Sequence, residues 1–344
     1  MLKNQKLLGI LALAAILVVG LAAPAAQAGD ITGVTNLLAA NHWDEQNPPQ
    51  LEMFNADTGD HMFTFDPLPD GLAPGTKATA FHDGYWYTFS TIDNVNLIAG
   101  IFRYDIDGTN PVKVAEMSGM VEGIAVSDDN HLYVGSSGGW GWVGGLYKFD
   151  MSTTPYTPVG QINSGNHQGT DVGPDGNVYT ANTANGKISY FDPNGNGLGQ
   201  IAQTRVWSLE FHPGGDLYST SYDSYESVAH YNSPLHPTDP LALVEEIPVP
   251  DFGGWNGIGK IHFLGEDTMF VSRIGQGIAR YLNDGGGWTL DPETEFVARP
   301  DVQVPRTWSF AVGSAPVPEP SSIALLVCGL LGLAFVSWRK RWSR

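Results

Sequence analysis

The chain has 344 residues, 42% of them hydrophobic, and a formal net charge of −19. Residues 29–314 hold 11 lysines and arginines against 35 aspartates and glutamates, a net charge near −24 that makes nucleic acid and anionic lipid poor partners. One cysteine, Cys328, lies near the C-terminus, so residues 29–314 can hold neither an intramolecular disulfide nor cysteine ligands for a metal, and their stability must come from an apolar core.

Residues 1–28 have the parts of a secretory signal peptide. Lys3 and Lys6 precede an apolar run over residues 7–21, and Ala26 and Ala28 place small residues at both recognition positions of a cleavage site. The apolar run is short for a membrane-spanning helix, which favours cleavage after Ala28 over an uncleaved anchor. The sequence therefore predicts an exported protein.

Residues 78–297 repeat one pattern of short strands and tight turns. Five units align on an aromatic residue at the end of the second strand, and each carries a further aromatic near the end of the third strand; the aligned residues are Tyr87, Tyr133, Tyr179, Tyr218 and Phe270. A period of about 40–50 residues built from four short strands is typical of β-propeller blades. An unrelated β-sandwich is the alternative, and the register of the two aromatic columns favours the propeller.

The two ends of residues 29–314 each hold part of a blade. Residues 29–66 supply a second, third and fourth strand, at residues 34–40, 51–55 and 61–65, but no innermost strand. Residues 307–312 form a lone strand that resembles residues 207–211, which open another unit. We expect the C-terminal strand to complete the N-terminal blade, because this closes the ring and leaves no open edge. The prediction is an all-β propeller of six blades, with seven if one lies hidden between residues 218 and 270.

No helix of ordinary length is expected in residues 29–314, because proline and glycine are frequent and the apolar residues alternate. Three segments share a related sequence, namely residues 123–133, 169–179 and 208–218. This pattern resembles that of NHL and SMP-30-like six-bladed propellers. The resemblance implies the fold, and a fold does not identify a function.

Residues 315–344 form a separate tail of three parts. Pro318, Glu319 and Pro320 come first, the largely apolar residues 323–338 follow, and a basic cluster of arginine and lysine begins at residue 339. The apolar run spans roughly 24 Å as a helix, marginally short of a ~30 Å bilayer core. Basic residues after the span hold that end in the cytoplasm and place the propeller outside.

This tail resembles the PEP-CTERM sorting signal of Gram-negative bacteria over residues 317–344. The resemblance implies recognition by an exosortase, removal of the span, and delivery to the cell surface or an exopolysaccharide matrix. Before processing, the tail would hold the protein in the membrane. A plain C-terminal anchor is the alternative.

Aromatic residues are concentrated in one set of predicted loops. In a propeller, the starts of the inner strands and the loops between second and third strands lie on the same face. The candidate ligand-binding residues of that face are Trp43, Trp140, Trp142, Tyr222, Tyr225 and Trp255. Aromatic rings beside amide and carboxylate groups suit the C–H face and hydroxyls of a sugar. Tryptophans that only cover the channel mouth, and a protein partner, are the alternatives.

A metal site is a further possibility on this face. The resemblance to SMP-30-like lactonases implies a divalent metal held by Glu, Asn and Asp from separate inner strands, and Glu122, Asn256 and Asp171 are the matching residue types. Oxygen ligands suit a cation such as Ca²⁺. The alternative for Glu122 is a bond to Arg205 or Arg306, since the family's full ligand set cannot be placed in register.

Histidines do not strengthen the case for an enzyme. His167, His212 and His262 are similar to the base of streptogramin lyases, but no acid is expected beside them, and no other catalytic motif is present. We therefore assign no catalytic residue. The predicted function is an exported cell-surface or matrix propeller that binds an exopolysaccharide or a protein partner through its loops, with a metal-dependent lactonase or esterase as the alternative.

Overall fold

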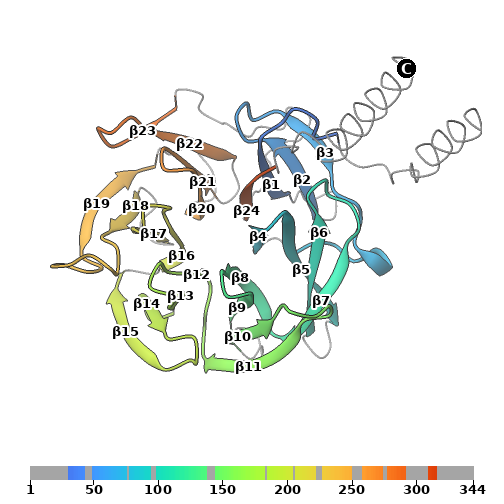
Figure 1. Cartoon of the computed structure of the whole chain (residues 1–344), viewed down its shortest axis with the longest axis horizontal. Helices are drawn as coiled ribbons and strands as arrows, with labels where there is room; N and C mark the ends of the chain where they lie inside the picture. The colour runs from blue at the N-terminus through green and yellow to red at the C-terminus, as the bar shows by residue number, and fades with distance from the viewer. Residues whose placement is uncertain are drawn as a thin grey trace, which may run out of the picture.

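The computed structural model describes residues 30–42, 49–75, 77–93, 98–137, 144–182, 184–203, 206–221, 227–249, 258–273, 277–291 and 309–315. Within these ranges the strands form six four-stranded antiparallel sheets, arranged as blades around a central axis (Figure 1). The predicted six-bladed propeller is confirmed, and the seven-bladed alternative is wrong. The signal peptide and the tail lie outside the described residues.

Each blade runs from an inner strand at the axis to an outer strand at the rim. The first blade combines both ends of the propeller, in the order β24 (Phe310–Ser314), β1 (Asn36–His42), β2 (Gln50–Asn55) and β3 (His61–Thr64). A 3₁₀ turn, η1 (Pro69–Gly71), lies between the first and second blades. The second blade holds β4 (Thr79–His82), β5 (Tyr85–Asp93), β6 (Ile98–Asp105) and β7 (Val112–Ser118), and the third holds β8 (Met120–Ser127), β9 (His131–Ser137), β10 (Gly145–Asp150) and β11 (Thr157–Ser164).

The remaining three blades follow in chain order. The fourth holds β12 (Thr170–Val172), β13 (Val178–Asn182), β14 (Lys187–Phe191) and β15 (Gly197–Ala202). The fifth holds β16 (Val206–Phe211), β17 (Leu217–Ser221), β18 (Ser227–Tyr231) and β19 (Leu243–Pro248). The sixth holds β20 (Ile258–Leu264), β21 (Thr268–Arg273), β22 (Ile278–Asn283) and β23 (Trp288–Leu290).

The ring closes as predicted, by pairing the last strand with the first. Strand β24 is antiparallel to β1, with Asn36 opposite Ser314 and Ala40 opposite Phe310. Both strands are apolar, and Leu38 and Phe310 are fully buried. The pairing satisfies the inner edge of β1, which would otherwise present unpaired backbone groups.

The aromatic column that revealed the repeat forms part of the core. Tyr87, Tyr133, Tyr179, Tyr218 and Phe270 are each at most 4% exposed. Tyr179, for example, packs edge-on against Phe211 of the following blade, with 4.8 Å between ring centroids. Its hydroxyl also donates to Asp175 in the preceding turn, where Gly176 adopts a φ of 76° that suits glycine. Tyr179 therefore packs against the neighbouring blade and also stabilises the turn that precedes its own strand.

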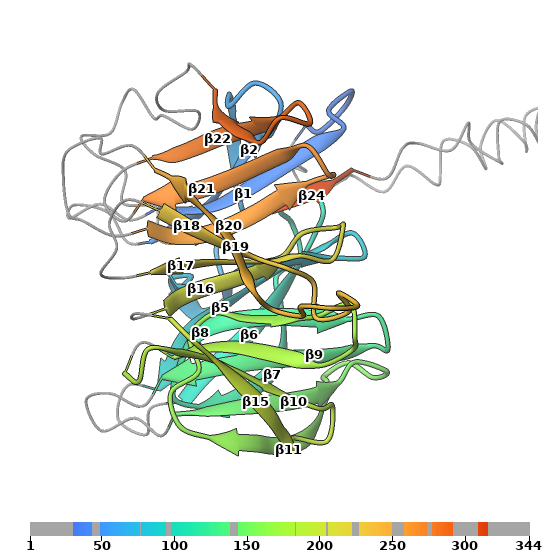
Figure 2. The same ribbon diagram turned by 90° about the vertical axis from the view of Figure 1, so that its left-hand side faces the viewer.

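The inner strands all run in one direction, so the propeller has two different ends (Figure 2). We call the end where they begin the loop face, and the end where they turn into the second strands the turn face. Strand β24 ends, and β1 begins, on the turn face. Within the described ranges, no helix has the length and apolar character needed to cross a bilayer.

Candidate functional site

The six inner strands surround a cavity of about 270 Å³ on the axis of the ring. A second hollow of about 460 Å³ shares Val126, Val172 and Phe211 with this cavity, and its other lining residues belong to turns such as those at Pro174 and Pro213. The turns lie at the ends of the inner strands. The cavity therefore continues to the turn face, and we call it the channel pocket.

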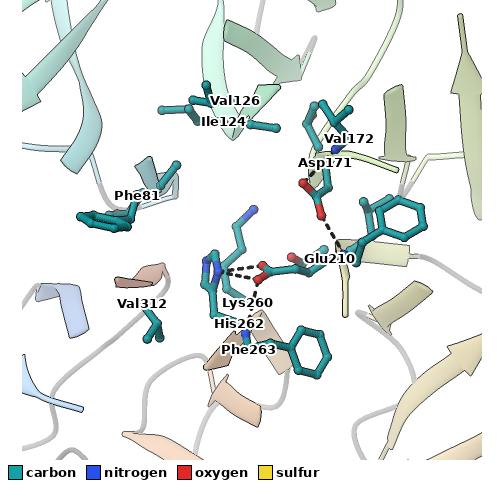
Figure 3. A pocket seen from close by; sticks show the side chains of 17 residues that line it. Phe81, Ile124, Val126, Asp171, Val172, Glu210, Lys260, His262, Phe263 and Val312 are labelled. Carbon is teal, nitrogen blue, oxygen red and sulfur yellow. Dashed lines mark hydrogen bonds and ion pairs between the residues drawn. The ribbon is translucent and has the colours of Figure 1, made fainter. Parts of the chain in front are cut away.

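Three titratable side chains occupy the same register position in three consecutive blades. Asp171 of β12, Glu210 of β16 and His262 of β20 each lie opposite the aromatic residue of their second strand. The equivalent positions in β4 and β8 are Ala80 and Ala125. One half of the pocket wall is thus charged and the other half is apolar (Figure 3).

Glu210 and His262 form a direct pair across neighbouring blades. The Nδ1 atom of His262 lies 2.8 Å from one carboxylate oxygen of Glu210 and 2.7 Å from the other. The ring also packs edge-on against Phe310, with 5.0 Å between centroids. A carboxylate at Nδ1 orients an imidazole and leaves Nε2 available as a base. The prediction that no acid lies beside His262 was wrong, because β16 and β20 are neighbours only in the folded ring.

Asp171 has a carboxyl group that changes protonation near neutral pH. Its two oxygens accept hydrogen bonds from the backbone N–H of Val172, at 2.8 Å, and of Phe211, at 2.7 Å. The side chain keeps some solvent contact through the channel, but protein encloses it otherwise. Burial, and then the negative charge of Glu210, raise the pKa of Asp171 to about 7 against the effect of these hydrogen bonds.

Lys260 extends from β20 across the channel to the third blade. Its Nζ atom donates to the backbone carbonyl of Glu122 at 3.1 Å. Burial lowers the pKa of Lys260 to about 8, although Glu122, Glu210 and Asp171 favour its charged form. The lysine is mostly charged at neutral pH and close to the point of losing its proton.

A second lysine crosses the channel closer to the loop face. The Nζ atom of Lys77, which precedes β4, lies 2.9 Å from Glu122 Oε1. The same atom lies 5.6 Å from the ring centroid of Trp207, on the far side of the ring in β16. The two lysines therefore cross the channel on its loop-face side, and the pocket continues toward the turn face.

Glu122 lies where the sequence predicted a metal ligand. Its Oε1 atom accepts hydrogen bonds from Lys77 and Ser137, and its buried Oε2 atom has no hydrogen-bond partner among the described residues. The alternative partners Arg205 and Arg306 lie outside the described residues, and among the described residues the basic partner of Glu122 is Lys77. The described ranges contain no group of three His, Cys, Asp or Glu residues arranged to hold a metal. They do not by themselves fit a divalent cation, and a site completed by Asn256, which lies outside them, stays a prediction.

The other predicted site residues also lie outside the described part of the chain. These are Trp43, Trp140, Trp142, Tyr222, Tyr225 and Trp255 of the loops, and Pro318, Glu319 and Pro320 of the tail. The sequence did contain a signal for the channel cluster, since Asp171, Glu210 and His262 each stand eight residues before the aromatic column. Of these three, Asp171 is predicted as a metal candidate and His262 as a base without an acid, and no role is predicted for Glu210.

Comparison with solved structures supports the fold. The periplasmic gluconolactonase of Pseudomonas aeruginosa superposes with a TM-score of 0.56 at 12% identity, over 83% of this chain and 99% of that one. A chain of the nidogen–laminin complex gives 0.56 at 14% identity, over 81% and 98%. A Bacteroides caccae protein of unknown function gives 0.54 at 12% identity, also over 81% and 98%. Such identities establish a shared architecture and no shared activity.

The tail gives a more specific match. No curated protein matches the chain, but the family model of the PEP-CTERM protein-sorting motif matches residues 316–341. The motif implies export and sorting by an exosortase-type system, with membrane anchoring through the C-terminus before processing. The chain is therefore a six-bladed β-propeller that carries a PEP-CTERM protein-sorting motif directly behind its closing strand.

Proposed function

We propose that this protein is displayed at the cell surface or in the extracellular matrix, where its loop face binds a polysaccharide or a surface protein. The observation that carries the proposal is the position of the sorting motif. Closing strand β24 ends at Ser314 on the turn face, and the motif begins at residue 316. Attachment on the turn face leaves the loop face directed away from the attachment point.

The composition of the loops supports a carbohydrate as the ligand. Trp140 and Trp142 alternate with glycines in residues 138–142, where they contribute little to strand formation. Tryptophan rings pack well on the C–H face of a sugar, and the acidic surface disfavours anionic polymers. A neutral or weakly charged polysaccharide therefore suits this face best.

The test is a pull-down with immobilised polysaccharides and the Trp140→Ala/Trp142→Ala double variant. We expect its apparent affinity to fall about 30-fold or more, because aromatic anchors at the centre of an interface each contribute about 2 kcal/mol or more. The control is Leu235→Ala, which truncates a side chain that is 61% exposed. Equal binding by the double variant and the parent protein would contradict a role for these tryptophans.

Hydrolysis of a lactone or ester is the second candidate function. The observation that favours it is Asp171, with a pKa near 7, beside the Glu210–His262 pair in a water-accessible pocket. A base in this pocket could take a proton from water as the water attacks a carbonyl carbon, and the Lys260 ammonium could stabilise the resulting oxyanion.

A panel of lactones and esters, assayed with and without a chelator, separates the possible mechanisms. Turnover that is lost in Asp171→Asn and insensitive to the chelator would assign the chemistry to the channel cluster. Chelator-sensitive turnover that is lost in Glu122→Gln would assign it to a metal at the opposite end of the channel. Absence of turnover with the entire panel would leave binding as the function.

A further inference from the structure

We propose that the channel pocket is a second ligand site, open on the turn face, that binds a small neutral polyhydroxylated molecule the size of one sugar ring. The proposal concerns the end of the propeller opposite the loop face. It therefore does not depend on the function proposed for the loops.

The first argument is the shape of the pocket, which two lysines cross on one side and which continues toward the turn face on the other. Lys260 extends from β20 to the backbone of Glu122 in β8. Closer to the loop face, Lys77 extends across the channel to the ring of Trp207. On the turn face, the pocket continues into the hollow beside Pro174 and Pro213. The pocket volume of about 270 Å³ lies just below the usual ~300–1,000 Å³ of small-molecule sites. The pocket can therefore hold one small molecule but not several units of a polymer.

The second argument is hydrogen-bonding capacity that the protein does not use. An ammonium group has three donors, and Lys260 Nζ makes one hydrogen bond, to Glu122, among the described residues. The Nε2 atom of His262 makes none there, and each Asp171 oxygen accepts one of about two possible bonds. Donors and acceptors thus face the same small space, and hydroxyl groups can satisfy both kinds at once.

The third argument is charge. The Lys260 ammonium offsets the charge of the Glu210 carboxylate, and Asp171, whose pKa burial raises to about 7, is partly neutral near pH 7. A cationic or anionic ligand would upset this balance inside an enclosed pocket, at a considerable desolvation cost. A neutral ligand incurs no such cost, while its hydroxyls still bond to the charged groups.

The experiment titrates the complete exported protein with single sugars and cyclitols, followed by calorimetry and ligand-observed NMR. The neutral probes are glucose, galactose, xylose and myo-inositol, and the charged probes are glucuronate and glucosamine. We expect at least one neutral probe to bind saturably, with its affinity reduced tenfold or more in Glu210→Gln and in Asp171→Asn. The control is Asp284→Asn, an exposed carboxylate in a turn between outer strands.

A second measurement on the unmodified protein keeps the test valid if those variants are unstable. A bound neutral probe should slow amide hydrogen exchange at Val172, Phe211 and Phe263, whose N–H groups contact the cluster. The Trp140→Ala/Trp142→Ala variant should bind the same probe unchanged, which separates this site from the loop face.

Three results would overturn the proposal. The first is no saturable binding of any neutral probe up to 50 mM, about the weakest affinity that titration resolves. The second is binding restricted to glucuronate or glucosamine. The third is binding that survives Glu210→Gln but is lost in the tryptophan variant, which would place the sugar on the loop face.

Discussion

Asp171 and His167 respond to pH in opposite directions, although they stand four residues apart. Burial raises the pKa of Asp171 to about 7 and lowers the pKa of His167 to about 4. His167 lies 2.8 Å from Thr180 Oγ1 and 3.0 Å from Asn163 Oδ1, so its neutral ring is held by hydrogen bonds. Both residues are neutral in their preferred native form, as enclosed titratable groups usually are.

We predict that Asp171→Asn flattens the pH dependence of stability between pH 4 and 7. The native pKa of Asp171 exceeds its unfolded value of 3.8, so the native state binds the proton more tightly. The contribution of Asp171 to stability is therefore greatest at low pH and is lost as the pH rises through about 7. Urea midpoints measured from pH 4 to 8 test this slope. An identical slope in the variant would show that Asp171 titrates normally.

For His167→Gln we predict a change on the acidic side. The native pKa of His167 is below its unfolded value of 6.5, so the native state resists protonation. Stability is then lost as the pH falls from about 6.5 to about 4, and the variant should lose less of it. Thermal scans over this range, with the exposed His61→Gln as the control, provide the measurement. If the variant lost more stability than the parent protein as the pH falls, the lowered pKa of His167 would be contradicted.

Contact between blades depends on glycines at one repeat position of the inner strands. A Cβ on Gly123 would lie 2.1 Å from the backbone oxygen of Gln168, and a Cβ on Gly169 would lie 2.6 Å from Ser208 Cα. Both glycines stand ten residues before the aromatic column. Each contact is to backbone of the next blade, which cannot move aside as a side chain could. The glycines therefore set how closely β8, β12 and β16 approach.

Gly123→Ala should accordingly destabilise the propeller by about 1–3 kcal/mol, the usual cost of an inserted methyl group in a packed site. The control is Gly197→Ala in β15, where a Cβ would have one neighbour at 3.9 Å. Denaturant unfolding of both variants provides the comparison. If Gly123→Ala lowered the free energy of unfolding no more than Gly197→Ala does, the neighbouring blades could move apart at this contact without a large loss of stability.

At the scale of the whole molecule, our proposals place attachment and recognition at opposite ends of the propeller. The ring closes with β24 on the turn face, directly before the sorting motif. The loop face therefore lies at the end away from the sorting motif, and the channel pocket opens at the same end as the motif. In the proposed arrangement, the loop face contacts large polymers, whereas the pocket opens beside the attachment point and binds only small molecules.

We predict that Pro318→Ala/Glu319→Ala/Pro320→Ala leaves folding unchanged and prevents delivery to the surface or matrix. The motif lies beyond the closing strand, so the substitutions alter sorting without altering the ring. Cell fractionation with an antibody to the propeller follows the distribution, and thermal unfolding checks the fold. The matched control replaces Pro234 and Pro237 by alanine, outside the motif. Unchanged delivery of the triple variant would show that another segment directs sorting.

Much of the architecture could be predicted because a propeller repeats. The aromatic column and its turns recur in five blades, and residues 29–66 lack the one strand that β24 supplies. The repeat is not perfectly regular, so a simple alignment does not bring the corresponding inner-strand positions of all blades together. Ala80 lies opposite Tyr87 seven residues later, whereas Asp171 and Glu210 lie eight residues before their partners. The turn at Asp83 and Gly84 is one residue shorter, which disrupts a simple alignment.

The amino-acid sequence by itself determined the blade repeat, the closing strand and the sorting tail, because each is a local pattern of neighbouring residues. Only the tertiary structure decided which side chains meet at the axis. Lys260 contacts Glu122, which is 138 residues earlier in the chain, and Lys77 reaches Trp207. These residues lie on or just before the inner strands of different blades, and they come within reach of one another only when the ring has closed.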